Sequence, residues 1–202
     1  MGRSSINVKR LTMWKLLTDS ITATTYDSEA YTFENELNSA KYSPKVETAS
    51  QYGDGVKVED YVAKDGGDIE ATIRGFKQGD YAFLFGEKET ADGTSVSAAD
   101  DIVPYNCTAY MTVRPDGKVN LYKFPKVKYM PQGEDSKQQE GSRIEYGTAQ
   151  LKGTYSPLLS NNHDCYKRLG VDPNTESQFI EKWFTEAGYY TAGTSDTDAT
   201  GG

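Results

Sequence analysis

The segment from residue 45 to residue 85 constrains the fold of this chain more than any other part of the sequence. Two runs of high β-propensity meet at Tyr52-Gly53-Asp54-Gly55, where Gly and Asp tolerate the positive φ angles of a tight hairpin turn. A third run follows, and its period-two alternation predicts a half-buried strand that buries Ile69, Ala71 and Ile73. The segment therefore predicts a scaffold with a projecting hairpin. It contains no loop typical of a catalytic or ligand-binding site.

Other parts of the chain also predict β-structure. Residues 8–17 predict a first strand with Trp14 in the core, and Pro115-Asp116-Gly117 predicts a second hairpin between two further strands. The expected strands around and after this turn are residues 105–113, 118–124, 126–130 and 143–155. Ser43-Pro44 is expected to break the chain before the first hairpin, and the polar stretches 87–101 and 131–142 are expected to be loops. The chain is therefore predicted to be mainly β.

Two short helices are also predicted. Residues 80–85 lie between a candidate N-cap, Asp80, and Gly86, although the same run could form a strand. The buried face of this helix would be Tyr81, Leu84 and Phe85. Later, Thr175 and Gln178 have the spacing of a capping box. The apolar face that follows consists of Phe179, Ile180, Trp183 and Phe184, and Gly188 ends the run. Residues 191–202 contain no apolar anchor and are expected to be disordered.

Length and charge exclude several classes of function. The 202 residues are enough for one substantial core. With 22 basic and 30 acidic residues the formal net charge is −8, which argues against charge attraction to nucleic acid or anionic membrane. No segment approaches the roughly 20 apolar residues of a membrane span. The first ten residues are too polar for a secretion signal. Two distant cysteines give no disulfide framework, so we expect folding in a reducing cytoplasm.

The chain contains 15 tyrosines and only 7 phenylalanines. Tyrosine combines an apolar ring with a hydroxyl group that prefers water, so it suits surfaces that are only partly buried. Two interpretations of this excess stay open, a solvated β-surface and a contact surface for a partner.

His163-Asp164-Cys165 is the one cluster with the character of a metal site or a nucleophile. A structural zinc site needs about four ligands, whereas the chain has one histidine and two cysteines. A Cys–His pair needs two side chains that face each other beside an orienting group, which three consecutive residues do not provide unaided. The sequence favours a polar loop here, and it predicts no enzyme, no metal and no cofactor.

Three weaker motifs have simpler explanations. Asp92, Asp100 and Asp101 lack the ligand spacing of an EF-hand and are expected to lie in solvated turns. Asn106-Cys107-Thr108 matches the glycosylation sequon, which without a secretion signal is a chance match. The chain has no Gly-x-x-x-x-Gly-Lys loop and no basic patch with interleaved aromatic residues.

Four segments, taken in their order and spacing, resemble the major tail protein family of long-tailed bacteriophages, the tube-forming type found in phages of Gram-positive bacteria. The first is Val46-Glu-Thr-Ala-Ser with its Gly-Asp-Gly tip. The second is Gly67-Asp-Ile-Glu-Ala-Thr-Ile, which runs into residues 80–86. The third and fourth are Glu145-Tyr-Gly-Thr-Ala-Gln-Leu-Lys-Gly-Thr-Tyr and Phe179-Ile-Glu-Lys-Trp-Phe. The resemblance covers roughly residues 6–190.

The resemblance implies a β-sandwich or half-barrel with a short flanking helix and a C-terminal helix. It divides the chain into a tail-tube β domain (residues 1–160), a C-terminal helical extension packed on it (residues 161–190) and a disordered tail (residues 191–202). Proteins of this family form rings, expected to be hexameric, that stack into the hollow tube through which DNA passes. A long loop or hairpin reaches the next ring.

By the same resemblance, the chain is a structural protein of the virion tail, made and assembled in the host bacterial cytoplasm. The expected partners are copies of itself, the tape-measure protein, and tail-terminator and tip proteins, with double-stranded DNA as a transient cargo and no membrane. The candidate assembly interface is the hairpin tip, Gln51, Tyr52, Gly53, Asp54 and Gly55, and residues 131–142 are a second candidate. We hypothesise that acidic side chains line the lumen and repel DNA phosphates.

Two other functions remain as alternatives. One is a free-standing β-sandwich that binds carbohydrate or a receptor on a phage tail or cell surface, with the tyrosines as its platform. An exposed row of aromatic side chains on a monomer would favour it. The other is a small enzyme centred on His163 and Cys165, which ranks last.

Overall fold

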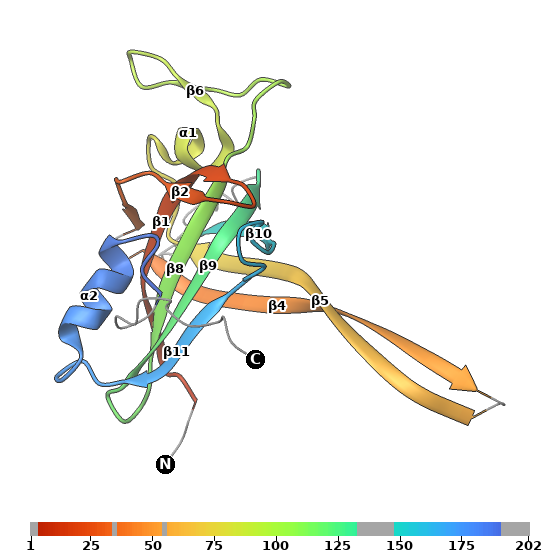
Figure 1. Ribbon diagram of the computed structural model, residues 1–202. Helices are drawn as coiled ribbons and strands as arrows, with labels where there is room; N and C mark the ends of the chain where they lie inside the picture. The colour runs from red at the N-terminus through yellow and green to blue at the C-terminus, as the bar shows by residue number, and fades with distance from the viewer. Residues whose placement is uncertain (1–3, 34–35, 54–55, 133–147, 191–202) are drawn as a thin grey trace, which may run out of the picture.

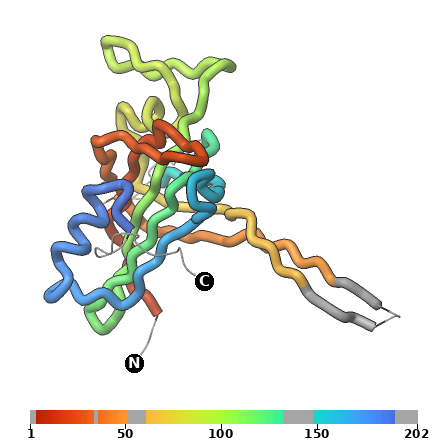
Figure 2. Tube along the Cα trace, in the orientation of Figure 1, coloured from red at the N-terminus to blue at the C-terminus, as the bar shows by residue number. Residues whose placement is uncertain are grey.

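The computed structural model describes residues 4–33, 36–53, 56–132 and 148–190 and contains a nine-stranded antiparallel sheet, a two-stranded sheet and two short helices (Figure 1, Figure 2). The large sheet has the order β2-β1-β8-β9-β10-β5-β4, with β3 beside β1 and β11 beside β9. Its strands are β1 (Asn7–Asp19), β2 (Thr24–Tyr26), β3 (Tyr31–Phe33), β4 (Leu37–Gly53), β5 (Val56–Ile73), β8 (Tyr105–Val113), β9 (Val119–Met130), β10 (Ala149–Tyr155) and β11 (Tyr166–Val171). The small sheet pairs β6 (Lys88–Glu89) with β7 (Ser95–Val96), and the helices are α1 (Asp80–Phe85) and α2 (Ser177–Thr185). The predicted class, mainly β with a flanking and a C-terminal helix, is confirmed, and the described sheet is not a closed barrel.

Alternating side chains of the central strands build two hydrophobic cores, one on each face of the sheet. The first core lies where β5, β10 and α1 pack over β1, β8 and β9, and it includes Phe124 and Leu151. The second core lies under α2, where Trp183 packs with Leu121 and with Trp14, the predicted core anchor. Both faces of β8 and β9 are therefore covered, which explains why these strands are buried along most of their length.

β4 and β5 form one long hairpin whose outer part extends far beyond the rest of the molecule (Figure 1). β10 pairs with β5 only from Gly67 to Ile73, whereas β4 and β5 remain paired as far as Gly53 and Val56. The part of β4 that follows Pro44 projects by about 30 Å at the usual rise of about 3.3 Å per residue. We call residues 45–66 the arm.

Two expectations for this hairpin are wrong. Pro44 does not break the chain but lies inside β4, opposite Gly67. β4 lies at one edge of the sheet, and an edge strand tolerates a residue without a backbone N–H. The register of β4 and β5 shifts between Pro44 and Val46, which accommodates the proline. The third run does form a strand that buries Ile69, Ala71 and Ile73, as predicted, but it is not a separate strand, because it is the inner half of β5 and continues directly from the arm.

Two glycines allow β5 to pass from the body of the protein into the arm. Gly66 has a φ of +64°, and a Cβ atom there would lie 2.0 Å from the carbonyl oxygen of Tyr155. A Cβ atom at Gly67 would lie 2.3 Å from the carbonyl oxygen of Ser43. Both distances are far below van der Waals contact, so the backbones approach one another this closely only because these positions carry no side chain.

The helix predicted at residues 80–85 is confirmed, and the alternative strand is wrong. Its N-cap is Gly79 rather than Asp80, which is the first helical residue and is buried. The carboxylate of Asp80 accepts hydrogen bonds from the backbone N–H of Lys77 (2.7 Å) and from the hydroxyl of Tyr31. Gly86, at a φ of +76°, ends the helix as predicted. Leu84 and Phe85 are buried, while Tyr81 is only partly buried.

The apolar face predicted for α2 is also confirmed, since Phe179, Ile180, Trp183 and Phe184 are all buried. The capping box is wrong, because the N-cap is Glu176 and makes no side-chain capping hydrogen bond. Part of the region expected to be a helical extension forms β11, which pairs with β9. The division of the chain into domains at residue 160 stays a prediction.

The other predicted strands are found in the structure where their residues are described. The β8–β9 hairpin is confirmed, with Gly117 at a φ of +80°, and residues 126–130 belong to β9. The strand expected at residues 143–155 is confirmed as β10, although residues 143–147 lie outside the described residues. Most of the loop 131–142 and all of residues 191–202 also lie outside them.

Gly66 provides a test of the bend at the base of the arm. Gly66→Ala should lower the free energy of unfolding by about 2–4 kcal/mol, because the new methyl group would overlap the backbone of Tyr155 and alanine disfavours a positive φ. Gly75→Ala is the matched control, since a Cβ atom there has no heavy atom within 4 Å and should change stability by about 0.5 kcal/mol or less. Urea unfolding followed by tryptophan fluorescence measures both. Equal stabilities of the two variants would contradict the close approach of Gly66 to the backbone of Tyr155.

Candidate assembly surfaces

The arm exposes apolar side chains on a two-stranded ribbon without a core of its own. Val46, Val62 and Tyr61 are 49%, 56% and 67% exposed. Thr48 lies opposite Val62, and Ala49 lies opposite Tyr61. Because directly opposed residues share a face and side chains alternate along a strand, Val46, Thr48 and Val62 share one face. Glu47 and Tyr61 share the other.

The predicted interface, Gln51, Tyr52, Gly53, Asp54 and Gly55, lies at the far end of the arm. Gly53 pairs with Val56, which confirms the hairpin, while Asp54 and Gly55 lie outside the described residues. The side chains of residues 51–60 are also outside the described part of the chain. The use of this tip as an interface therefore stays a prediction. Sequence reasoning located the turn and the projecting hairpin, but missed that both of its strands continue into the body of the sheet.

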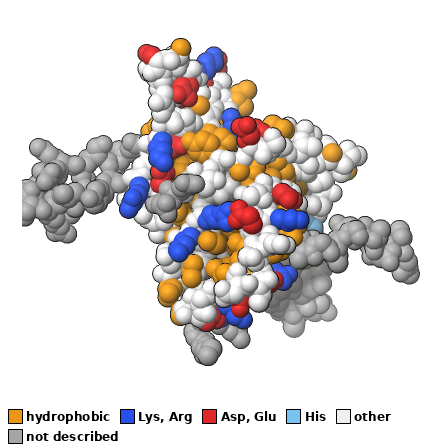
Figure 3. Space-filling view, turned by 90° about the vertical axis from the view of Figure 1, so that its left-hand side faces the viewer, with side chains coloured by type: hydrophobic (Ala, Val, Ile, Leu, Met, Phe, Trp, Pro, Cys, Tyr) orange, Lys and Arg blue, Asp and Glu red, His pale blue; other side chains and the backbone are white. Residues whose placement is uncertain are grey.

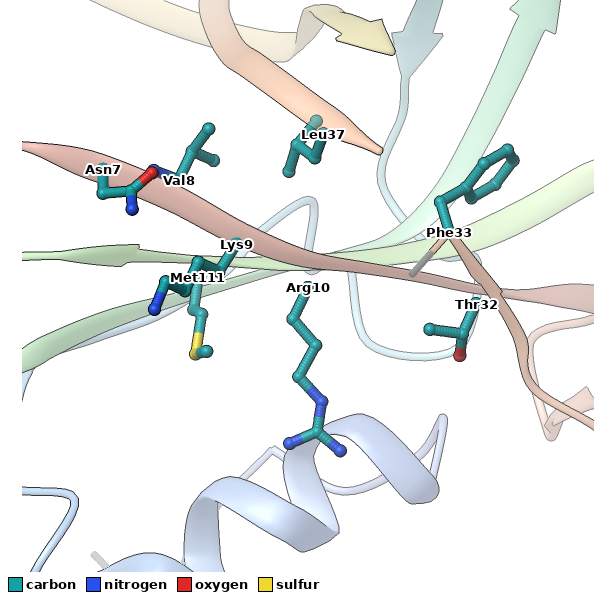
Figure 4. Close-up of a pocket in the computed structure, with 8 residues that line it drawn as sticks. All are labelled: Asn7, Val8, Lys9, Arg10, Thr32, Phe33, Leu37 and Met111. Atoms are coloured by element: carbon teal, nitrogen blue, oxygen red, sulfur yellow. The ribbon is translucent and has the colours of Figure 1, made fainter. Parts of the chain in front are cut away.

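A groove of about 660 Å³ follows one edge of β1 near its N-terminal end (Figure 4). β8 pairs with one edge of β1 at residues 7–9, whereas β3 and β2 pair with the other edge only from Leu11 onward. Within the described ranges, no strand pairs with this second edge at residues 7–10. The N–H of Val8 donates instead to the side-chain oxygen of Asn7 (2.8 Å). The groove is lined by Val8, Phe33, Leu37 and Met111 and by the polar residues Asn7, Lys9, Arg10 and Thr32.

Arg10 fixes one wall of this groove to α2. Its φ is +61°, and the register between β1 and β8 shifts between Lys9 and Thr12, so the strand bulges at this point. The side chain points toward α2 (Figure 4), where the guanidinium donates two hydrogen bonds to Glu181 (3.0 and 2.9 Å) and lies 4.7 Å from the ring centre of Phe184. These hydrogen bonds lower the pKa of Glu181. Sequence reasoning identified neither Arg10 nor the groove, which is formed by four separate strands, β1, β3, β4 and β8.

Lys123 of β9 connects the sheet to the C-terminal end of α2. Its side chain is fully buried, and Nζ donates hydrogen bonds to the backbone oxygens of Glu186 (2.8 Å), Ala187 (3.3 Å) and Tyr189 (3.0 Å). These carbonyls follow the last turn of α2, where the helix dipole favours a positive charge. We call this arrangement the lysine clasp.

Aromatic rings complete the lysine clasp. Nζ lies 5.1 Å from the ring centres of Trp14 and Trp183 and 5.4 Å from that of Tyr190, distances at which the ring faces attract a cation. Among the described residues, no carboxylate forms an ion pair with Lys123. Burial therefore dominates and lowers the pKa of Lys123 to about 8.

The His163-Asp164-Cys165 cluster makes structural contacts in the described structure. Nδ1 of His163 lies 2.9 Å from the hydroxyl of Tyr166. Burial raises the pKa of the Cys165 thiol to about 12, so this group is protonated at neutral pH and is a poor nucleophile. Within the described residues, no three or more His, Cys, Asp or Glu side chains are grouped so as to hold a metal ion.

The weaker motifs also occupy structural positions. Asp92 accepts a hydrogen bond from the hydroxyl of Thr90, and Asp101 accepts one from the backbone N–H of Ala98 (2.7 Å), so both stabilise turns. Asn106 of the sequon is fully buried in β8 and is therefore inaccessible to a glycosyltransferase in the folded chain.

Most of the described tyrosines are buried or partly buried. Tyr110 stacks on Tyr122 with ring centres 5.0 Å apart, and Tyr166 stacks on Tyr190 at 3.7 Å. Among the described aromatic side chains, only Tyr61 (67%) and Tyr105 (39%) are exposed, and they lie on the arm and on β8. The described surface therefore lacks the row of exposed aromatic residues expected of a carbohydrate-binding module.

Charges of both signs are interspersed with hydrophobic side chains on the face shown in Figure 3, where neither sign forms a continuous patch. No helix in the described part of the chain is long and apolar enough to cross a membrane.

Comparison with known proteins finds only distant similarity, and this is to solved structures. No protein-family model matches the chain, and no curated protein matches it. A solved structure, a chain of the anti-feeding prophage baseplate determined by cryo-electron microscopy with sixfold symmetry, is similar with a TM-score of 0.41 and 6% sequence identity. The match covers 83% of this chain and 97% of that chain. A similarity this low does not assign the chain to a family.

The lysine clasp predicts how stability depends on pH. The pKa of Lys123 is about 8 in the folded state, below the ordinary value of 10.5, so the unfolded chain binds more protons between these two pH values. The contribution of Lys123 to stability must therefore rise with pH in this window. The free energy of unfolding of the wild type minus that of Lys123→Met should increase by about 2–3 kcal/mol from pH 7.5 to pH 10.5.

Urea unfolding at a series of pH values measures this difference, in which the titration of tyrosines and cysteines common to both proteins cancels. Lys118→Met, at an exposed position in the β8–β9 turn, is the control and should give a constant difference from the wild type. If the difference between wild type and Lys123→Met stayed constant or fell with pH, burial would not lower the pKa of Lys123 in the folded state.

Proposed function

We propose that this protein is a structural subunit of a phage tail, which assembles with copies of itself into stacked rings that form the tail tube. The observation that carries this proposal is the arm, a ribbon that leaves the body of the protein and exposes Val46, Tyr61 and Val62. The order and spacing of the four segments that resemble the major tail protein family support it.

The physical reason lies in the stability of the arm. An isolated two-stranded ribbon is marginally stable in water, and its unpaired strand edges can pair with other chains. Contact with a neighbouring subunit would bury the exposed apolar side chains and pair these edges. A closed ring satisfies every subunit in the same way, because each one both offers and receives the same contact.

The finer features of the proposal come from the family resemblance. The rings would be hexameric, and the tape-measure, tail-terminator and tip proteins would bind the tube during assembly in the host cytoplasm. DNA would pass through the lumen as a transient cargo. The net charge of −8 suits this role, because like charges on the lumen wall would keep DNA phosphates from adhering.

The proposal predicts that one charge on the arm prevents assembly without unfolding the protein. Val62→Asp should raise the concentration needed for ring or tube formation at least tenfold, because burial of an unpaired carboxylate costs more than about 1.4 kcal/mol. Negative-stain electron microscopy and light scattering across a concentration series measure assembly, and thermal melting checks the fold. Leu169→Asp is the matched control, since Leu169 is a similarly exposed residue (64%) on β11, away from the arm.

Wild-type protein that remains monomeric at every concentration, even with tail initiator proteins present, would overturn the proposed function. Assembly of Val62→Asp at the wild-type concentration would show that this face of the arm lies outside the contacts.

A further inference from the structure

The open edge of β1 offers backbone hydrogen-bonding groups beside a groove. Residues 7–10 lack a strand partner on this edge within the described ranges, whereas β3 and β2 occupy the same edge further along β1. The N–H of Val8 donates to the side chain of the preceding residue, a local contact that an incoming strand could replace. An unpaired edge of this kind is the site at which extended segments add to a sheet.

The two sides of the groove differ in chemistry. Val8 and Leu37 project on one side of β1, and Arg10 projects on the other, toward α2 (Figure 4). Lys9 follows Val8 in the strand, so it lies on the opposite face from Val8 and is exposed. A strand added to this edge would therefore place alternate side chains against the apolar side and against the side that carries Lys9, since the guanidinium of Arg10 is already paired with Glu181.

The arm matches this pattern. Along β4, Val46 and Thr48 lie on one face and Glu47 lies on the other. The sequence from residue 45 to residue 65 has five acidic residues against three lysines, and one of these, Lys45, already pairs with Asp68 (2.9 Å). Near its base the arm thus offers Val46 and Val62 on one face, with Lys64 opposite Val46, and the acidic side chain of Glu47 on the other face.

The arm of the same chain cannot reach the groove. Figure 1 shows the arm leaving the body on the side away from α2 and β1. The occupant must therefore come from another molecule.

We propose that the groove along residues 7–10 of β1 receives the arm of a second copy of this chain, with β4 of the arm adding to the open edge of β1. Val46 then packs beside Val8 and Leu37, and Glu47 faces Lys9. This inference rests on the proposed self-assembly and specifies which surfaces meet.

Charge reversal tests this pairing. Lys9→Glu and Glu47→Lys should each raise the concentration at half-assembly about fivefold, and the double variant Lys9→Glu/Glu47→Lys should return it to within about twofold of wild type. Both residues are exposed, so the fold should be retained, and thermal melting checks this. Lys118→Glu, in the exposed β8–β9 turn, is the matched control and should assemble as wild type.

Photocrosslinking locates the contact directly. Tyr61, exposed on the arm, is replaced by p-benzoylphenylalanine, and intermolecular crosslinks are mapped by mass spectrometry; the same replacement at Leu169 is the control. Crosslinks to residues 4–10 or 31–37 of the second molecule support the inference. Crosslinks elsewhere, or rings that are insensitive to Lys9→Glu, overturn it and leave the proposed function standing. A chain that neither assembles nor crosslinks at any concentration overturns both.

Discussion

The buried ammonium group of Lys123 joins the sheet to α2, and the second core depends on this contact. A charged group taken out of water needs compensation, and here three carbonyl oxygens beyond the end of α2 and three aromatic rings provide it. The same contacts hold Trp183 against Trp14 and so close one face of the sheet. With that face covered by α2, the arm and the open edge of β1 are among the parts of the described sheet that lack partners within the chain.

Sequence reasoning predicted the elements whose local chemistry decides their structure. The β8–β9 hairpin follows from Pro115-Asp116-Gly117, and the end of α1 follows from Gly86, because each turn needs a backbone conformation that few residues adopt. The apolar face of α2 follows from helical periodicity. Pro44 misled the prediction, since a proline breaks a central strand but not an edge strand, and edge position is a property of the whole sheet.

The candidate surfaces were less predictable, because they too depend on how the whole sheet is arranged. The hairpin tip is visible in the sequence, but the groove needs β1, β3, β4 and β8 to come together, and no local pattern encodes that approach. Lys123 did leave a signal that the prediction missed. It shares the parity of Val119 and Leu121 in β9, so it occupies a position where an apolar residue is expected. A lysine in such a position is informative because its burial requires dedicated partners.

The charge of the chain explains how exposed strand edges can coexist with controlled association. A net charge of −8 makes copies repel one another at long range, which opposes random pairing of the arm with other chains. At short range, Arg10 is already paired with Glu181, so the basic charge beside the open edge of β1 comes from exposed Lys9, which an acidic side chain on the proposed incoming strand would face. Repulsion between whole molecules and attraction at one groove together favour a single geometry of contact over many. A subunit built in this way can remain soluble on its own and still have one preferred mode of assembly.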